Sequence, residues 1–184
     1  MRLRGFFGGM VLLCALVSAV PVGAALNPAW TRPFPPFRIA GNLYYVGSED
    51  LASYLIATPK GLILINSSLQ SSVPMIRRSV ETLGFHFSDI KILLISHAHY
   101  DHCAGSALVK RLTGAKYFVM DADVPVVESG GKADFQYGAE KDMLYPPAHV
   151  DRVRHDGDTA GHGGQVTVGG PVPPRARPPR APGP

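Results

Sequence analysis

Four side chains that commonly bind metals lie within six residues of one another, in the segment HAHYDH at residues 97–102. His97, His99 and His102 supply imidazoles, and Asp101 supplies a carboxylate. This combination suits Zn²⁺, and ligands so close in sequence can serve two ions about 3.5–4 Å apart. The segment therefore predicts a transition-metal site with His97, His99, Asp101 and His102 as its ligands.

Cys103 directly follows this segment. Two interpretations stay open for it: a thiolate ligand of the same metal site, or a small buried residue beside it. Three further histidines, His86, His149 and His155, lie outside the segment, and we expect them to be surface or loop residues.

The candidate ligands follow a run of residues typical of an interior strand. Residues 90–95 are apolar except for Lys91, and residues 104–112 have the pattern of a short helix that ends at Gly114. Residues 116–120 predict the next strand. A strand–helix–strand order indicates helices packed on a mixed sheet, with the ligands just beyond the carboxyl end of a strand.

The other segments complete an α/β pattern. Apolar residues at helical spacing predict a helix at residues 72–83, which Gly84 ends. Alternating and β-branched residues predict three strands in a hairpin or meander, at residues 37–48, 51–58 and 62–66. Further expected elements are a short helix within residues 121–131, strands at 150–153 and 165–168, and a tight turn at 156–158.

The composition divides the chain into three parts. A basic start, an apolar run and a small-residue ending predict a signal peptide over residues 1–24, and hence a periplasmic protein without membrane contact after cleavage. We expect the folded domain at residues 25–168. Residues 169–184 are rich in proline and arginine and lack aromatic residues, which predicts a disordered tail.

The net charge of +4 does not indicate a nucleic-acid partner. Two arginines lie in residues 1–24 and three in residues 169–184, whereas all 14 acidic residues lie between these segments. The expected domain is therefore nearly neutral and lacks the basic surface that nucleic acid requires. Composition leaves the oligomeric state open.

At the metal-binding segment the chain resembles a metallo-β-lactamase of class B, third subclass. The histidine at position 102 favours the third subclass. The HxHxDH pattern alone marks the superfamily, which also contains glyoxalases, lactonases and RNA-processing nucleases. The similarity extends from about Trp30 to Asp158 and includes residues 92–102, 108–115, 127–131, 145–147, 151–153 and 156–158.

This resemblance implies an αββα sandwich that holds two zinc ions. By the motif, His97 and His99 would bind the first ion, and Asp101 and His102 the second. A hydroxide between the ions would attack the carbonyl of a β-lactam, and Asp101, as the catalytic residue, would orient that hydroxide. The implied partner is a small-molecule β-lactam substrate.

The chain departs from the family pattern after the Asp156-Gly157-Asp158 turn. The family takes another histidine from a GHT-type loop, but an ungapped continuation places Arg175 there, and a gap is needed to bring His162 to that position. We expect little more than the N-terminal half of the sandwich, with a truncation or frame change after about residue 159. The alternatives are another hydrolase of the superfamily (a lactonase or thioesterase-like enzyme) or a non-enzymatic fragment.

Overall fold

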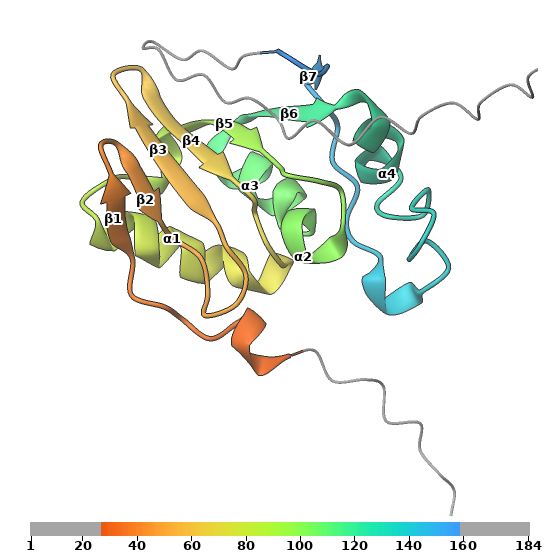
Figure 1. Cartoon of the computed structure of the whole chain (residues 1–184), viewed down its shortest axis with the longest axis horizontal. Coiled ribbons are helices and arrows are strands. Elements are labelled where there is room, and N and C mark those ends of the chain that lie inside the picture. Colours follow the sequence, from red (N-terminus) through yellow and green to blue (C-terminus); the bar gives the residue numbers. More distant parts are fainter. Residues whose placement is uncertain (1–26, 159–184) are drawn as a thin grey trace, which may run out of the picture.

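The candidate ligands lie beside a single mixed sheet in the part of the chain that the structure describes, residues 27–158 of a computed structural model. The seven strands of this sheet lie in sequence order, β1-β2-β3-β4-β5-β6-β7 (Figure 1). Strands β1 to β4 are antiparallel, whereas β4 to β7 are parallel. The sheet therefore changes from a meander to crossover connections at β4, just before the candidate site.

The antiparallel part consists of four short strands: β1 (Phe37–Ala40), β2 (Leu43–Tyr45), β3 (Tyr54–Thr58) and β4 (Gly61–Ile65). The single strand expected at residues 37–48 was wrong, because the chain reverses between β1 and β2. Gly41 has a φ of 52° at this reversal, a conformation that glycine adopts without steric cost. The meander is therefore longer by one strand than its residue pattern indicated.

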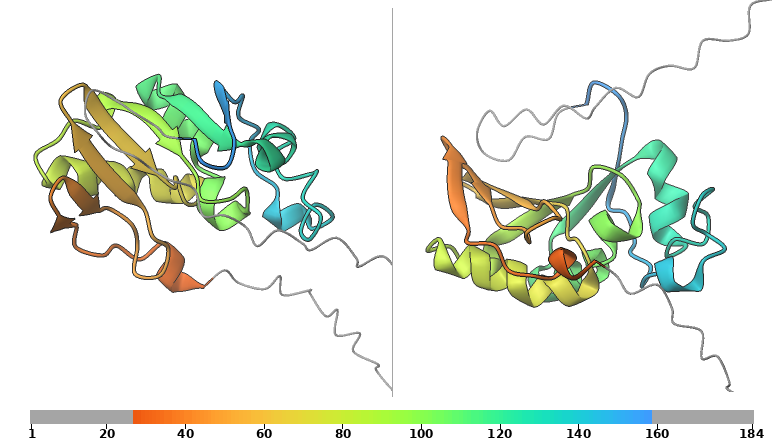
Figure 2. Two further views of the ribbon diagram at one scale, coloured as in Figure 1. Left: turned by 45° about the horizontal axis from the view of Figure 1, so that its top comes forward. Right: turned by 60° about the horizontal axis from the view of Figure 1, so that its bottom comes forward.

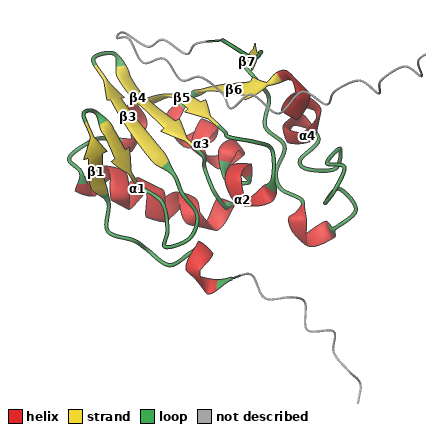
Figure 3. Ribbon diagram, viewed as in Figure 1, coloured by secondary structure: helices red, strands yellow, loops and turns green. Residues whose placement is uncertain are grey.

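The parallel part alternates strands with helices (Figure 3). Its strands are β5 (Ile90–Leu94), β6 (Lys116–Met120) and β7 (Arg152–Arg154). Its α-helices are α1 (Val73–Thr82), α2 (Tyr100–Cys103), α3 (Ser106–Thr113) and α4 (Val124–Glu128). Short 3-10 helices complete the order: η1 (Pro28–Trp30), η2 (Gln70–Ser72), η3 (Phe87–Asp89), η4 (Asp121–Asp123) and η5 (Lys141–Met143).

The helices begin and end where their terminal residues allow. Pro74 lies in the first turn of α1, where its missing N–H has no helical partner in any case. Gly114 ends α3 in the left-handed conformation, and its amide donates to the Lys110 carbonyl. The helix expected at residues 104–112 starts later, at Ser106, because α2 forms a separate turn before it.

Helices α1 and α3 cover one face of the sheet, and the main core lies between them and the strands (Figure 2). Alternate strand residues point into this core, including Leu55, Leu64, Leu93 and Tyr117, all fully buried. The residues between them face the opposite side and form a second apolar cluster of Ile56, Ile63, Ile92 and Leu94.

The described residues thus form one helix layer and one sheet layer of an α/β fold, the half of the sandwich that was expected. No helix within residues 27–158 is both long and apolar enough to cross a membrane. The predictions for residues 1–24, for the strand at 165–168 and for the tail at 169–184 lie outside the described residues, as do those for His162 and Arg175.

Candidate metal centre

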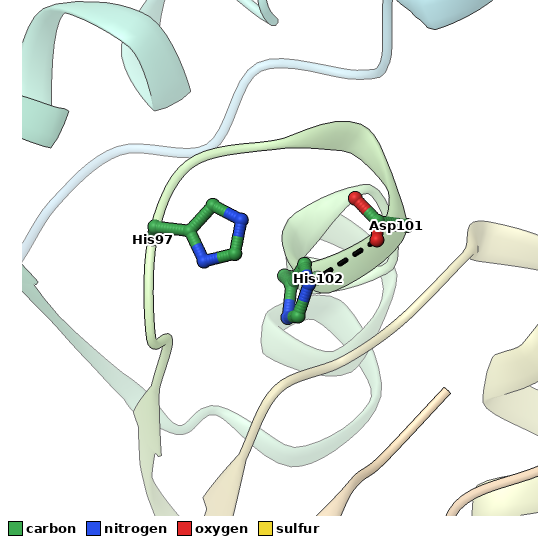
Figure 4. Close-up of side chains that lie close together, drawn as sticks. All are labelled: His97, Asp101 and His102. Carbon is green, nitrogen blue, oxygen red and sulfur yellow. Dashed lines mark ion pairs between the residues drawn. The ribbon is translucent and has the colours of Figure 1, made fainter. Parts of the chain in front are cut away.

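Three of the four predicted ligands converge beyond the carboxyl end of β5. One ligand atom from each of His97, Asp101 and His102 lies within 4.8 Å of the other two. Figure 4 shows His97 on the loop after β5, facing Asp101 and His102 on the short helix α2. A turn of helix places the adjacent Asp101 and His102 so that both reach the space beside His97. The loop and α2 together therefore define a candidate metal centre.

The distances within this group are short. Nε2 of His102 lies 3.2 Å from Oδ2 of Asp101, and the ring centroids of His97 and His102 are 4.0 Å apart. The side chains of His102 and Asp101 are partly exposed, at 26% and 28%. A metal ion and a small molecule can thus both reach the group from solvent.

His99 lies beside this group but is directed elsewhere. Its ring centroid is 4.6 Å from that of His97, while its Nε2 lies 3.5 Å from Oδ2 of Asp134. The Asp134 side chain is only 7% exposed, and its other oxygen accepts hydrogen bonds from the amides of Gln136 and Tyr137. Because this fixed carboxylate lies beside Nε2 of His99, Nδ1 is the nitrogen of that ring that remains available to an ion.

A hydrogen-bonded pair, Asn66 and Ser96, orients His102. The Asn66 amide nitrogen lies 3.2 Å from Nδ1 of His102, and its side-chain oxygen accepts from the Ser96 amide at 2.9 Å. The Ser96 hydroxyl lies 3.1 Å from the same Nδ1. With Nδ1 held, Nε2 of His102 is the nitrogen turned toward Asp101 and the metal position.

The electrostatic environment keeps two of the candidate ligands in metal-binding form. Burial lowers the pKa of His97, and the neighbouring His102 and His99 lower it further, so its imidazole is neutral at pH 7. Burial alone would raise the pKa of Asp101, but the hydrogen bond and the charge of His102 outweigh this effect and lower it. Neutral imidazole and ionised carboxylate are the forms that coordinate metals.

The structure favours the structural interpretation of Cys103. The side chain is buried, its thiol donates to the His99 carbonyl at 3.2 Å, and burial raises its pKa to about 12. A thiol with this pKa is protonated at neutral pH and is a poor metal ligand. His86, His149 and His155 are exposed, as expected.

Two cavities adjoin the group. One of about 220 Å³ is lined by Trp30, His99, Tyr100, Asp101, Tyr137 and Met143. The other, of about 450 Å³, opens between the loop of His97 and His99 and the segment of Phe135, which is almost fully exposed. A substrate bound in either cavity would touch the candidate ligands.

Two neighbours of the ligands, Asn66 and Asp134, were missed by the sequence analysis. Asn66 is the last residue of a predicted strand. Its φ of 62° is one that asparagine adopts more readily than most residues, so an asparagine at this strand end is the hint that the sequence offers. Asp134 lies in a polar loop far along the chain from His99, and no local pattern distinguishes it.

The donor set fits zinc. Two imidazoles and a carboxylate are ligands that Zn²⁺ takes in catalytic sites, and such sites typically combine three protein ligands with an open position. Within residues 27–158 this group provides three donor atoms next to solvent-accessible cavities.

Comparison with known proteins agrees with the geometry. The chain matches the metallo-beta-lactamase superfamily over residues 51–176, and it therefore belongs to this superfamily. This match, together with the sheet and helix layers, confirms the predicted fold class.

Solved structures narrow the resemblance. The FEZ-1 metallo-beta-lactamase from Legionella gormanii is 62% identical, with a TM-score of 0.72 over 73% of this chain and 51% of that chain. The class B3 di-zinc metallo-beta-lactamase LRA-12 from an Alaskan soil metagenome is 43% identical, with a TM-score of 0.73 over 77% and 53% of the two chains. GOB-18 from Elizabethkingia meningoseptica is 45% identical, with a TM-score of 0.73 over 77% and 52%.

These similarities confirm the resemblance to the third subclass. The chain spans about half the length of the metallo-beta-lactamases that it matches.

Proposed function

We propose that the protein is a zinc-dependent hydrolase that opens the β-lactam ring of antibiotics. The observation that carries this proposal is the convergence of His97, Asp101 and His102 at the carboxyl end of β5. It occurs in a chain that is 62% identical to a metallo-beta-lactamase over the matched region. The similar structures favour this activity over the lactonase or thioesterase-like alternative.

The four predicted ligands divide between two ions in this proposal. His97 and His99 would hold the first ion, His99 through Nδ1 because its Nε2 lies 3.5 Å from Oδ2 of Asp134. Asp101 and His102 hold the second. When bound, zinc polarises the substrate carbonyl and lowers the pKa of water from about 15.7 to about 7, so that a nucleophile forms at neutral pH.

Asp101 is the proposed catalytic residue. Oδ2 of its carboxylate pairs with His102, and its other oxygen would orient the attacking hydroxide. The lowered pKa of Asp101 keeps the carboxylate ionised for this role.

The family resemblance implies further ligands after the Asp156-Gly157-Asp158 turn, where this chain departs from the family pattern. Each ion receives two protein ligands from the residues named here, one fewer than a catalytic zinc normally has. An ungapped continuation places Arg175, not a histidine, at the next ligand position of the family, and His162 reaches that position only with a gap.

We also propose that the protein acts in the periplasm. This rests on the basic start, the apolar run and the small-residue ending of residues 1–24, which are typical of a signal peptide.

A substrate panel tests the proposed activity. The purified full chain, supplied with zinc, is assayed against a chromogenic cephalosporin, a lactone and a thioester, with and without a chelator. We expect chelator-sensitive hydrolysis of the cephalosporin that Asp101→Asn abolishes. Preferential hydrolysis of the lactone or thioester, or no hydrolysis of any substrate by the zinc-loaded chain, would contradict the proposal.

A further inference from the structure

Tyr145 connects a distant loop to the backbone of the metal-binding segment. It is 9% exposed, and its hydroxyl donates a hydrogen bond of 2.7 Å to the carbonyl of Ala98. Ala98 lies between His97 and His99, the two residues proposed to hold the first ion. Tyr145 belongs to the Tyr145-Pro146-Pro147 motif, which has no role in the proposed reaction.

The peptide groups of Ala98 are bound from two directions. While Tyr145 binds its carbonyl, its amide faces the carboxylate of Asp123 on η4 and offsets part of the burial that raises the pKa of that carboxyl. Ala98 is also almost completely buried. Both polar backbone atoms of Ala98 thus face a group from a separate element, so this short stretch has little freedom to rotate.

Two glycines allow the tyrosine to approach. The Tyr145 amide donates to the Gly130 carbonyl at 3.1 Å. A Cβ on Gly130 would collide with the Tyr145 carbonyl, and one on Gly131 would lie 3.0 Å from Cε1 of the ring. Both glycines also have positive φ, at 69° and 90°. Gly130, Gly131 and Tyr145 therefore pack as one unit beside the metal-binding segment.

We propose that Tyr145 is a positioning residue for the first metal ion. Its hydroxyl fixes the Ala98 carbonyl, and thereby the relative directions of His97 and His99. This inference rests on the proposed zinc binding by these two histidines. Without the hydroxyl, the buried carbonyl loses its donor, and the peptide that joins Ala98 to His99 is no longer held by Tyr145.

Zinc affinity of Tyr145→Phe tests the proposal. The substitution keeps the ring and removes only the hydroxyl, and we expect zinc to bind about 10-fold more weakly, in the range found when partners of metal ligands are removed. The matched control is Tyr117→Phe, since Tyr117 is fully buried and its hydroxyl accepts from Ser106 rather than from the metal-binding segment. A merely structural role would lower the free energy of unfolding in both variants and leave zinc affinity unchanged in both.

The zinc affinities of the two variants either support or overturn the positioning role of Tyr145. Equal zinc affinities of the wild type and Tyr145→Phe, or equal weakening in Tyr117→Phe, would overturn the positioning role. If Tyr145→Phe does not fold, Asp123→Ala takes its place, because Asp123 faces the amide of the same residue, Ala98, from a partly exposed position. Unchanged affinity in that variant would likewise refute the proposal.

The test is separable from that of the proposed activity. A wild type that binds zinc but opens no β-lactam would remove the proposed substrate and leave the positioning role standing, provided Tyr145→Phe weakens zinc. A wild type that binds no zinc would overturn both.

Discussion

Replacement of Asn66 is expected to destabilise the protein through two separable effects. Asn66 is buried at the end of β4, where its side chain joins Ser96 to His102. It also holds a φ of 62°, in the left-handed region. Asn66→Ala removes the side-chain hydrogen bonds. It also puts alanine, which adopts the left-handed conformation less readily than asparagine, at this position.

The magnitude follows from these contacts. The short bond to the Ser96 amide and the bond to His102 contribute about 1 kcal/mol each, because Ser96 is exposed and its amide can bind water instead. Alanine in the left-handed region costs about 1 kcal/mol more than a residue that adopts it readily. We therefore expect Asn66→Ala to lower the free energy of unfolding by about 3 kcal/mol.

Asn66→Gly separates the two contributions. It loses the same hydrogen bonds but adopts positive φ without the steric cost, so the expected loss is about 2 kcal/mol. Urea unfolding followed by circular dichroism measures both variants beside the wild type. If both lose less than about 1 kcal/mol, the hydrogen-bond argument is wrong. If alanine and glycine are equally destabilising, the backbone argument is wrong.

Two further predictions concern residues outside the candidate centre. Burial would raise the pKa of Asp151, but hydrogen bonds from Lys110 and from the Tyr117 amide lower it to about 2. The stabilisation that ionised Asp151 contributes is thus complete above about pH 4 and is lost as the pH falls through about 2. Asp151→Asn should therefore destabilise the protein less and less over this interval. Unfolding measurements at several pH values test this expectation. Gly105→Ala should cost about 1–3 kcal/mol, because its Cβ would lie 2.6 Å from the Ser67 carbonyl oxygen and 2.7 Å from Cγ2 of Val73. Gly84→Ala, which meets no atom within 4 Å, should lose only about 1 kcal/mol from its positive φ, and an equal loss in both would refute the packing argument.

Local patterns were sufficient for most elements of the parallel half. The strand expected at residues 116–120 is β6 itself, and the helix expected at 72–83 differs from α1 by one residue at each end. The helix has apolar residues at helical spacing and a terminating glycine, and the strand is a short run of apolar and aromatic residues after Lys116, signals that depend on neighbouring residues alone. The β1–β2 reversal was missed because Gly41-Asn42 lies inside an otherwise strand-like run.

The metal-binding segment could be identified from its spacing, but its supports could not. His97, Asp101 and His102 lie close together because six residues cannot separate them far. Asn66, Asp134 and Tyr145 reach the same segment only through the order of the strands and through long loops. Such contacts leave no periodic trace in the sequence, and they also direct His99 toward Asp134 rather than toward the other ligands.

The change from antiparallel to parallel pairing at β4 has a consequence for the order of folding. Strands β1 to β4 join neighbours through short connections, so they close small loops with little loss of chain entropy. The pairing of β4 with β5 must wait until α1 has crossed over, and contacts at such sequence separation slow folding. Asn66 follows β4, whereas Ser96 and His102 follow β5, so the parallel pairing is needed to bring them together. A newly made chain therefore completes its meander before it gains the capacity to capture an ion.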